Sequence, residues 1–177
     1  YDPMQQHVRA IPGEGTKVPI WILGSSLYGA QLAAHLGLPY AFASHFAPQA
    51  LAQAAKVYRD RFNPSAVLDK PYFMFAINVF AASTNEEAHY IKSSHQQGFA
   101  NLISGRPGLL PRPVKDINQT LDAMTLDSVN SALSCSVTGD LASITTQLST
   151  LIARYQPDEV MINGAIHDHD ARLKSFE

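Results

Sequence analysis

Residues 18–44 read VPIWILGSSLYGAQLAAHLGLPYAFAS, and this stretch decides the fold class. Two continuous apolar runs, residues 18–23 and 38–44, are typical of strands that are covered on both faces, as in a parallel sheet. Residues 27–36 between them carry apolar side chains at helical spacing, with serines before them as N-caps and a glycine after them as a stop. The pattern predicts one strand–helix–strand unit.

The same alternation continues along the rest of the chain. Further strands are expected at residues 72–82 and 159–163. Further helices are expected at residues 48–62, 85–104, 116–133, 140–155 and 168–176, with a break somewhere in the third of these. Residues 105–114, rich in glycine and proline, predict an irregular loop, and residues 1–17 predict a loop that leads into the first strand.

Four apolar strands that alternate with helices imply an α/β fold of parallel βαβ units with right-handed connections. Such a fold fits half of a (β/α)8 barrel, because a complete barrel typically needs about 250 residues. It also fits a small open doubly wound sheet. The pattern leaves both architectures open, within a single domain of 177 residues.

The composition narrows the class of protein. Apolar residues make up 46% and charged residues 16% of the chain, and the net charge of -2 gives no basic excess for a nucleic-acid backbone. No stretch has the roughly 18 apolar residues that a membrane span needs. Cys135 is the only cysteine, which excludes an intramolecular disulfide and fits the cytoplasm. Because the chain opens Tyr-Asp-Pro-Met, we interpret it as a fragment of a longer protein.

In both architectures the loops that follow the strands carry the functional site. Gly24-Ser25-Ser26 places backbone N–H groups and two hydroxyls at a helix N-terminus, where the helix dipole favours an anion such as a phosphate monoester. A plain N-cap explains the same residues, and on this motif alone it is the stronger interpretation. The lysine of a Walker loop and the further glycines of a dinucleotide fingerprint are missing.

The other candidate residues are weaker. His45 follows the second strand, where an imidazole either bonds a ligand or transfers a proton, or is simply solvated. His167-Asp168-His169 suggests a metal, but no third ligand stands nearby, so Asp168 is better explained as a helix cap and no metal site is predicted. Cys135 is better explained as a half-buried structural residue than as a nucleophile.

One stretch goes further than these physical arguments. WILGSSLYGAQLAAHLGLPYAFASHFAP (residues 21–48) closely resembles the fifth strand, fifth helix and sixth strand of the bacterial luciferase-like flavin monooxygenases. VRAIPGEG (8–15) resembles the segment before that strand, and residues 158–177 resemble the eighth strand and final helix. SVTGD (136–140) resembles the step into the seventh helix, although Val-Gly-Thr-Pro is the commoner order there. The motifs follow the order of the family over nearly the whole chain.

The resemblance implies a (β/α)8 TIM barrel of which this chain supplies strands five to eight. It implies a monooxygenase that reacts reduced FMN, supplied by a separate NAD(P)H-dependent reductase, with oxygen. The resulting flavin hydroperoxide oxidises an aldehyde or a similar small organic substrate. The phosphate of FMN then falls on the loop after strand five, at Gly24, Ser25, Ser26, Leu27 and Tyr28. Ser44 and His45 approach the flavin ring or the substrate, with His45 as the candidate catalytic residue.

The part of the barrel that is missing shapes what we expect of the chain. The family's first four strands supply ring contacts and a basic residue that helps to hold the phosphate, and these have no counterpart here. Half a barrel exposes unpaired strand edges, so we expect a homodimer or pairing with the missing amino-terminal half, and no catalysis by this chain alone. Two alternatives stay open: a non-catalytic flavin-binding protein of the same fold, and an open-sheet protein that binds another phosphorylated ligand.

Overall fold

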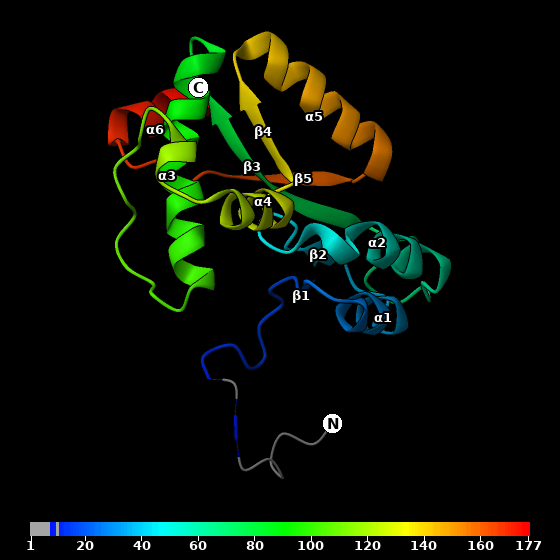
Figure 1. Cartoon of the computed structure of the whole chain (residues 1–177). Coiled ribbons are helices and arrows are strands. Elements are labelled where there is room, and N and C mark those ends of the chain that lie inside the picture. The colour runs from blue at the N-terminus through cyan, green and yellow to red at the C-terminus, as the bar shows by residue number, and fades with distance from the viewer. Residues whose placement is uncertain (1–7, 10) are drawn as a thin grey trace.

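The computed structural model describes residues 8–9 and 11–177; the rest of the expected leading loop lies outside them. They form an α/β fold around one parallel sheet (Figure 1). The strands are β1 (Ile22–Gly24), β2 (Tyr40–Phe42), β3 (Phe73–Ala81), β4 (Ser136–Gly139) and β5 (Glu159–Asn163). The helices are α1 (Leu27–Leu36), α2 (Leu51–Asp60), α3 (Asn85–Ile103), α4 (Ala123–Ala132), α5 (Leu141–Tyr155) and α6 (His169–Phe176), with 3-10 turns at Pro48–Ala50 and Ile117–Gln119.

The long strand β3 holds the sheet together, because it pairs with three other strands. Its first residues, Phe73–Phe75, pair with β2, and β2 pairs in turn with β1. Its last residues, Asn78–Ala81, pair with β4, while β5 pairs along Met74–Asn78. All of these pairings are parallel, which confirms the expected class of sheet.

Local capping explains why most helices begin where the sequence predicted. The side chains of Asp122, Asp140 and Asp168 each accept a backbone N–H two or three residues into α4, α5 and α6, and Thr84 does the same for α3. The break expected within residues 116–133 lies between a 3-10 turn capped by Asp116 and the start of α4. Each of these caps replaces a hydrogen bond that a helix end otherwise leaves to water.

Three strand predictions were wrong in their bounds or their number. The first strand starts at Ile22 rather than residue 18, and the second covers residues 40–42 of the predicted 38–44. Val18 and Ile20 are 70% and 65% exposed, so their apolar character does not come from packing in this sheet. One strand, β4, has no counterpart among the predicted strands, because SVTG is short and half polar and resembles the start of a helix.

The main core lies on one face of the sheet. Alternate residues of β3, from Phe73 to Val79, pack with α1, α2 and α5 into one buried cluster. Within it the ring of Tyr40 lies 5.3 Å from that of Tyr58 and 5.9 Å from that of Phe73. Full burial of each such side chain contributes roughly 1.5–3 kcal/mol. This cluster fixes the carboxyl ends of β1, β2 and β3, which carry the candidate loops.

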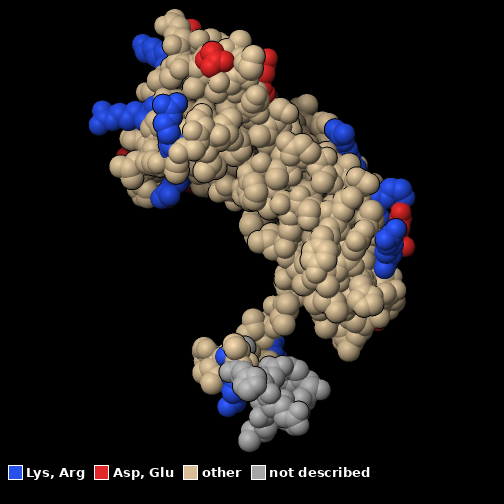
Figure 2. Space-filling model, turned by 60° about the horizontal axis from the view of Figure 1, so that its bottom comes forward, with Lys and Arg blue, Asp and Glu red and all other residues tan. Residues whose placement is uncertain are grey.

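The other face of the sheet is only partly covered. By strand register, Leu23 of β1 and Met161 of β5 point away from the main core, and they are 72% and 53% exposed. In the view of Figure 2 the charged side chains lie toward the ends of the molecule, while the middle shows neither Lys and Arg nor Asp and Glu. Within the described residues, no helix is long and apolar enough to cross a membrane.

Candidate functional site

The loop between β1 and α1 has the geometry of an anion site. Ser26 occupies the N-cap position with an extended backbone (φ −141°, ψ 169°), yet its side chain makes no capping hydrogen bond within the described residues. Ser25 and Ser26 are both exposed, and the first turn of α1 holds no acidic residue. Ser26 therefore stands at the N-cap without making the capping bond, and both serines are exposed beside a helix N-terminus.

Tyr40, a buried residue of β2, holds the backbone of this loop in place. Its hydroxyl donates a hydrogen bond of 3.2 Å to the carbonyl of Ser26, and its ring is fully buried. Burial raises the pKa of Tyr40 to about 12, so the hydroxyl remains a donor at neutral pH. The backbones of Gly24 and Gly29 approach closely over this ring, since a Cβ atom on Gly24 would lie 3.4 Å from the Cα of Gly29. Both glycines allow the loop to turn tightly onto the helix.

The next two predicted residues of this loop differ in their surroundings. Leu27 is half-buried and packs against the main core, so it anchors the first turn of α1. Tyr28 is 72% exposed and projects from the same turn. An exposed aromatic ring beside this candidate anion site offers a flat surface to a ligand, whereas Leu27 only anchors the helix.

The second predicted loop, after β2, is brought directly beside the first. The backbone N–H of Ala43 donates a 2.9 Å hydrogen bond to the carbonyl of Gly24. Ser44 is fully buried, and its hydroxyl donates to the carbonyl of Ala76 at 2.6 Å. In this structure the Ser44 side chain therefore holds β2 against β3.

His45 is the more available of the two residues after β2. Its ring is half-buried, and its Nδ1 has no hydrogen-bond partner among the described residues. The ring packs edge-on against Phe46 at 4.7 Å. Burial lowers the pKa of His45, so the imidazole is neutral near pH 7 and offers one donor and one acceptor.

A buried asparagine that the sequence analysis did not identify connects the strand ends. The side-chain nitrogen of Asn78 donates to the carbonyl of His45 at 2.6 Å and to the hydroxyl of Ser136 at 3.3 Å. Its oxygen accepts from the side chain of Asn163 at 3.3 Å. One residue of β3 thus links the end of β2, the start of β4 and the end of β5. The sequence does show Asn78 as a single asparagine inside the apolar run of residues 72–82. Because buried polar groups need hydrogen-bond partners, such a residue indicates a polar contact within the core.

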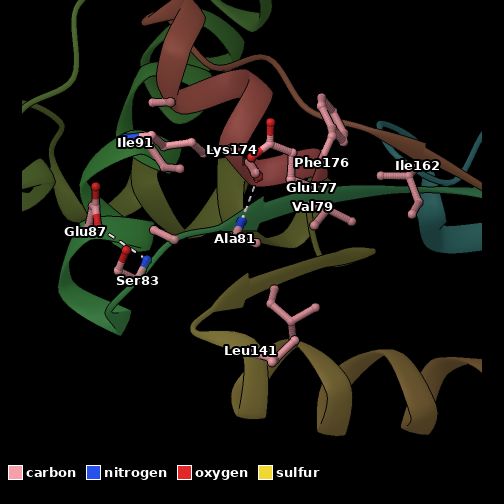
Figure 3. Close-up of a pocket in the computed structure, with 14 residues that line it drawn as sticks. Val79, Ala81, Ser83, Glu87, Ile91, Leu141, Ile162, Lys174, Phe176 and Glu177 are labelled. Atoms are coloured by element: carbon pink, nitrogen blue, oxygen red, sulfur yellow. Dashed lines mark hydrogen bonds between the residues drawn. The ribbon is translucent and has the colours of Figure 1, made fainter.

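The largely apolar pocket shown in Figure 3 lies elsewhere, at the end of β3 against α6. Its volume is about 400 Å³, and Leu141 projects toward it from the start of α5. The hydroxyl of Ser175 accepts the backbone N–H of Ala81 at 2.9 Å, which attaches α6 to β3. Glu87, Lys174 and Glu177 are its ionisable residues, and none of them forms a nucleophile–base pair. This pocket therefore shows no catalytic arrangement of side chains.

The remaining candidates of the sequence have structural roles. Asp168 caps α6 by accepting the N–H of Ala171 at 2.8 Å, as expected. Within the described part of the chain, no three His, Cys, Asp or Glu side chains are placed to hold a metal ion. Cys135 is buried in the main core, and burial raises the pKa of its thiol. A protonated, inaccessible thiol agrees with a structural rather than a nucleophilic cysteine.

Comparison with known proteins gives a consistent result. The family model described as luciferase-like monooxygenase matches residues 1–149. The sequence is 50% identical over 171 residues to the luciferase-like monooxygenase of Escherichia coli (strain K12), which covers 97% of this chain and 51% of that protein. It is 43% identical over 174 residues to YvbT of Bacillus subtilis (strain 168), covering 98% and 52%. The chain thus spans about half the length of the curated relatives it matches.

Solved structures resemble the fold over a similar extent. The crystal structure of apo-MsnO8 matches with a TM-score of 0.74 and 25% identity, over 99% of this chain and 54% of that one. An F420-dependent secondary alcohol dehydrogenase in complex with an F420-acetone adduct matches with a TM-score of 0.53 and 14% identity, over 92% and 48%. At 14% identity, the similarity to the alcohol dehydrogenase concerns the fold alone.

Proposed function

The chain belongs to the luciferase-like monooxygenase family, and from this membership we propose that it is the carboxyl-terminal half of an FMN-dependent monooxygenase. In the complete protein, bound reduced FMN would supply the oxygen chemistry, and the substrate would be an aldehyde or a similar small organic compound. Delivery of reduced FMN by a separate reductase and a cytoplasmic location stay predictions.

The β1–α1 loop fits the phosphate of such a cofactor. A phosphate group needs several donors and no nearby carboxylate, and it gains from a helix dipole. The loop offers the exposed hydroxyls of Ser25 and Ser26 and the N-terminus of α1, whose first turn holds no acidic residue. The observation that carries the proposal is that Ser26 stands at the N-cap while its hydroxyl remains uncommitted to the helix.

The sheet supports the proposal of half a barrel. β1 pairs only with β2, and β5 pairs only with β3, within the residues described, so each has a second edge without a strand. In a (β/α)8 barrel every strand is paired on both sides. We assign β1, β2, β3 and β5 to barrel strands five to eight, with β4 as an additional strand on β3. The partly exposed face with Leu23 and Met161 would then line the barrel interior.

The residues of this chain would act by binding and orienting. Ser25, Ser26 and the start of α1 would hold the phosphate, with Tyr28 beside it. His45 would face the flavin ring or the substrate as a neutral imidazole, since burial lowers its pKa. Ser44 would keep β2 against β3 through its bond to Ala76 and so hold His45 in place.

The test compares two flavins on one protein. Replacing Ser25→Ala and Ser26→Ala together in the complete protein should weaken the binding of FMN by about 2–4 kcal/mol, because two hydrogen bonds to the phosphate are lost. Riboflavin, which lacks the phosphate, should bind both proteins equally, as measured by flavin fluorescence. Ser83→Ala, in the exposed loop after β3, is the control. Unchanged FMN affinity would remove this loop from the cofactor site.

A second assay addresses the reaction itself. The complete protein, given reduced FMN, air and a long-chain aldehyde, should form the corresponding acid. FMN binding without any oxidation of aldehydes or similar compounds would identify a non-catalytic flavin-binding protein of the same fold.

A further inference from the structure

Asn78 is the one polar residue of β3, and its side chain is fully buried. The other residues of the strand, from Phe73 to Ala81, are all apolar. A buried amide whose groups lack partners is unfavourable, so an apolar strand keeps an asparagine only where its hydrogen bonds are needed. The partners of Asn78 therefore indicate its role.

Two of these partners lie beside Asn78 in the sheet. By strand register, Asn78 is opposite Ser136 of β4 and opposite Asn163 of β5. Its oxygen accepts from the side chain of Asn163, and its nitrogen lies 3.3 Å from the hydroxyl of Ser136. Because that hydroxyl donates to the carbonyl of Leu133, it accepts from Asn78. These contacts fix which way the amide of Asn78 faces.

The third partner of Asn78 is His45, which lies outside the sheet. The amide nitrogen donates to the backbone carbonyl of His45 at 2.6 Å, the shortest bond that Asn78 makes. Within the described residues, this is the one hydrogen bond that involves His45. The imidazole itself packs edge-on against Phe46 and makes no hydrogen bond to hold it. The position of the ring therefore depends on how the backbone of His45 is anchored.

We propose that Asn78 is a positioning residue for the oxidation reaction: its amide anchors the loop after β2 so that His45 faces the flavin ring or the substrate. This inference rests on the proposed function, in which His45 acts at the carboxyl end of the sheet. A firm anchor matters there, because a reacting group displaced by about 1 Å loses up to about 100-fold in rate. β3 suits this role, since it is paired on both sides at Asn78.

A double-mutant cycle on the complete protein tests this role, with kcat for aldehyde oxidation as the readout. Asn78→Leu, which keeps the branched shape but loses all three hydrogen bonds, and His45→Gln should each lower kcat at least about tenfold. The variant with both changes should be slower than His45→Gln by no more than about twofold, because Asn78 acts through His45. FMN affinity should not change, since Tyr40 holds the carbonyl of Ser26. Asn78→Thr, a smaller polar residue suited to a strand, replaces Asn78→Leu if that variant does not fold.

Gln96→Met is the matched control. Gln96 is buried and donates to Asn130 at 2.8 Å, so this variant also loses a buried hydrogen bond, but not one that reaches His45. Its kcat should equal that of the wild-type protein. Three outcomes would overturn the inference: an unchanged kcat in His45→Gln, the same loss of kcat in Gln96→Met as in Asn78→Leu, or a double variant in which the two losses multiply.

An NMR titration of the His45 ring separates this inference from the proposed function. Burial lowers the pKa of His45. In Asn78→Leu a loosened loop should admit water, so this pKa should rise toward the ordinary value of about 6.5, whereas Gln96→Met should leave it unchanged. A wild-type protein that oxidises no aldehyde contradicts the proposed function, and the titration then still decides whether Asn78 anchors His45. An active wild-type protein with the same His45 titration in Asn78→Leu contradicts only the role of Asn78.

Discussion

The backbone N–H of Ala43 donates a hydrogen bond of 2.9 Å to the carbonyl of Gly24. This bond extends the β1–β2 pairing past the last ladder residues and joins the two loops to which the sequence assigned the chemistry. The candidate anion loop at Ser26 and the unpartnered Nδ1 of His45 therefore lie at one end of the described sheet. Their relative position is set by this backbone bond together with the buried side chains of Tyr40, Ser44 and Asn78.

The turn after α1 provides the first prediction. Gly37 has a left-handed backbone (φ 63°), and a Cβ atom there would lie 2.5 Å from the carbonyl oxygen of Asn63. Gly37→Ala should lower the free energy of unfolding by about 2–4 kcal/mol, from backbone strain plus this clash. Urea unfolding of the complete protein measures it.

Gly105→Ala is the matched control for this change. Gly105 has a similar backbone angle (φ 70°), but no atom lies within 4 Å of the place where a Cβ would stand. Only the backbone strain applies there, so a loss of about 1 kcal/mol is expected. Equal losses for the two variants would show that the contact with Asn63 contributes nothing.

The additional strand β4 provides the second prediction. The side-chain amide of Gln147 accepts the N–H of Thr138 at 3.1 Å and donates to its carbonyl at 2.8 Å. Gln147 thus occupies the place of a neighbouring strand beside β4. Gln147→Leu should lower the free energy of unfolding by about 2 kcal/mol, because both backbone groups lose their partner.

The control for Gln147 is another helix glutamine, Gln53, which is exposed on α2. Gln53→Leu should change the free energy of unfolding by less than about 0.5 kcal/mol. Hydrogen exchange of the Thr138 amide gives a second readout, since it should speed up in Gln147→Leu alone. An unchanged exchange rate there would mean that Gln147 does not protect this strand.

The sequence predicted helices better than strands, for a physical reason. Helix starts depend on local caps such as Asp140 and Asp168, which a sequence shows directly. Strand bounds depend on a partner, so the apolar Val18 looked like a strand residue although no pairing reaches it, and Ser136–Gly139 forms a strand because β3 lies beside it. The same limit applies to the site. Ser26 and His45 follow strands and were found, whereas Asn78 acts through hydrogen bonds to residues far away in the chain.

The incomplete sheet provides the third prediction, on association. Leu23 and Met161 are exposed on the uncovered face, and β1 and β5 each keep an edge without a strand in the described structure. Such edges pair readily with other chains. The 177-residue chain alone should therefore form dimers or larger assemblies in light scattering. Adding the amino-terminal half of a relative should convert it to a one-to-one complex. A stable monomer that ignores the added half would instead indicate a complete open sheet.

The last prediction concerns pH and His95. Burial, with Lys92 and His45 nearby, lowers its pKa to about 4, whereas the unfolded chain has the ordinary value of about 6.5. Between these values the unfolded state binds more protons, so this contribution to stability is complete above pH 6.5 and is lost as pH falls toward 4. Going from pH 7.5 to 5 should remove up to about 2 kcal/mol of the free energy of unfolding through this residue. In His95→Phe that part of the pH dependence should vanish, measured by urea unfolding at both pH values.

His89→Phe is the control for this change. His89 lies on the exposed side of the same helix, so this variant should keep the wild-type pH dependence. If His95→Phe keeps the wild-type dependence too, burial of His95 is not the source of this pH dependence.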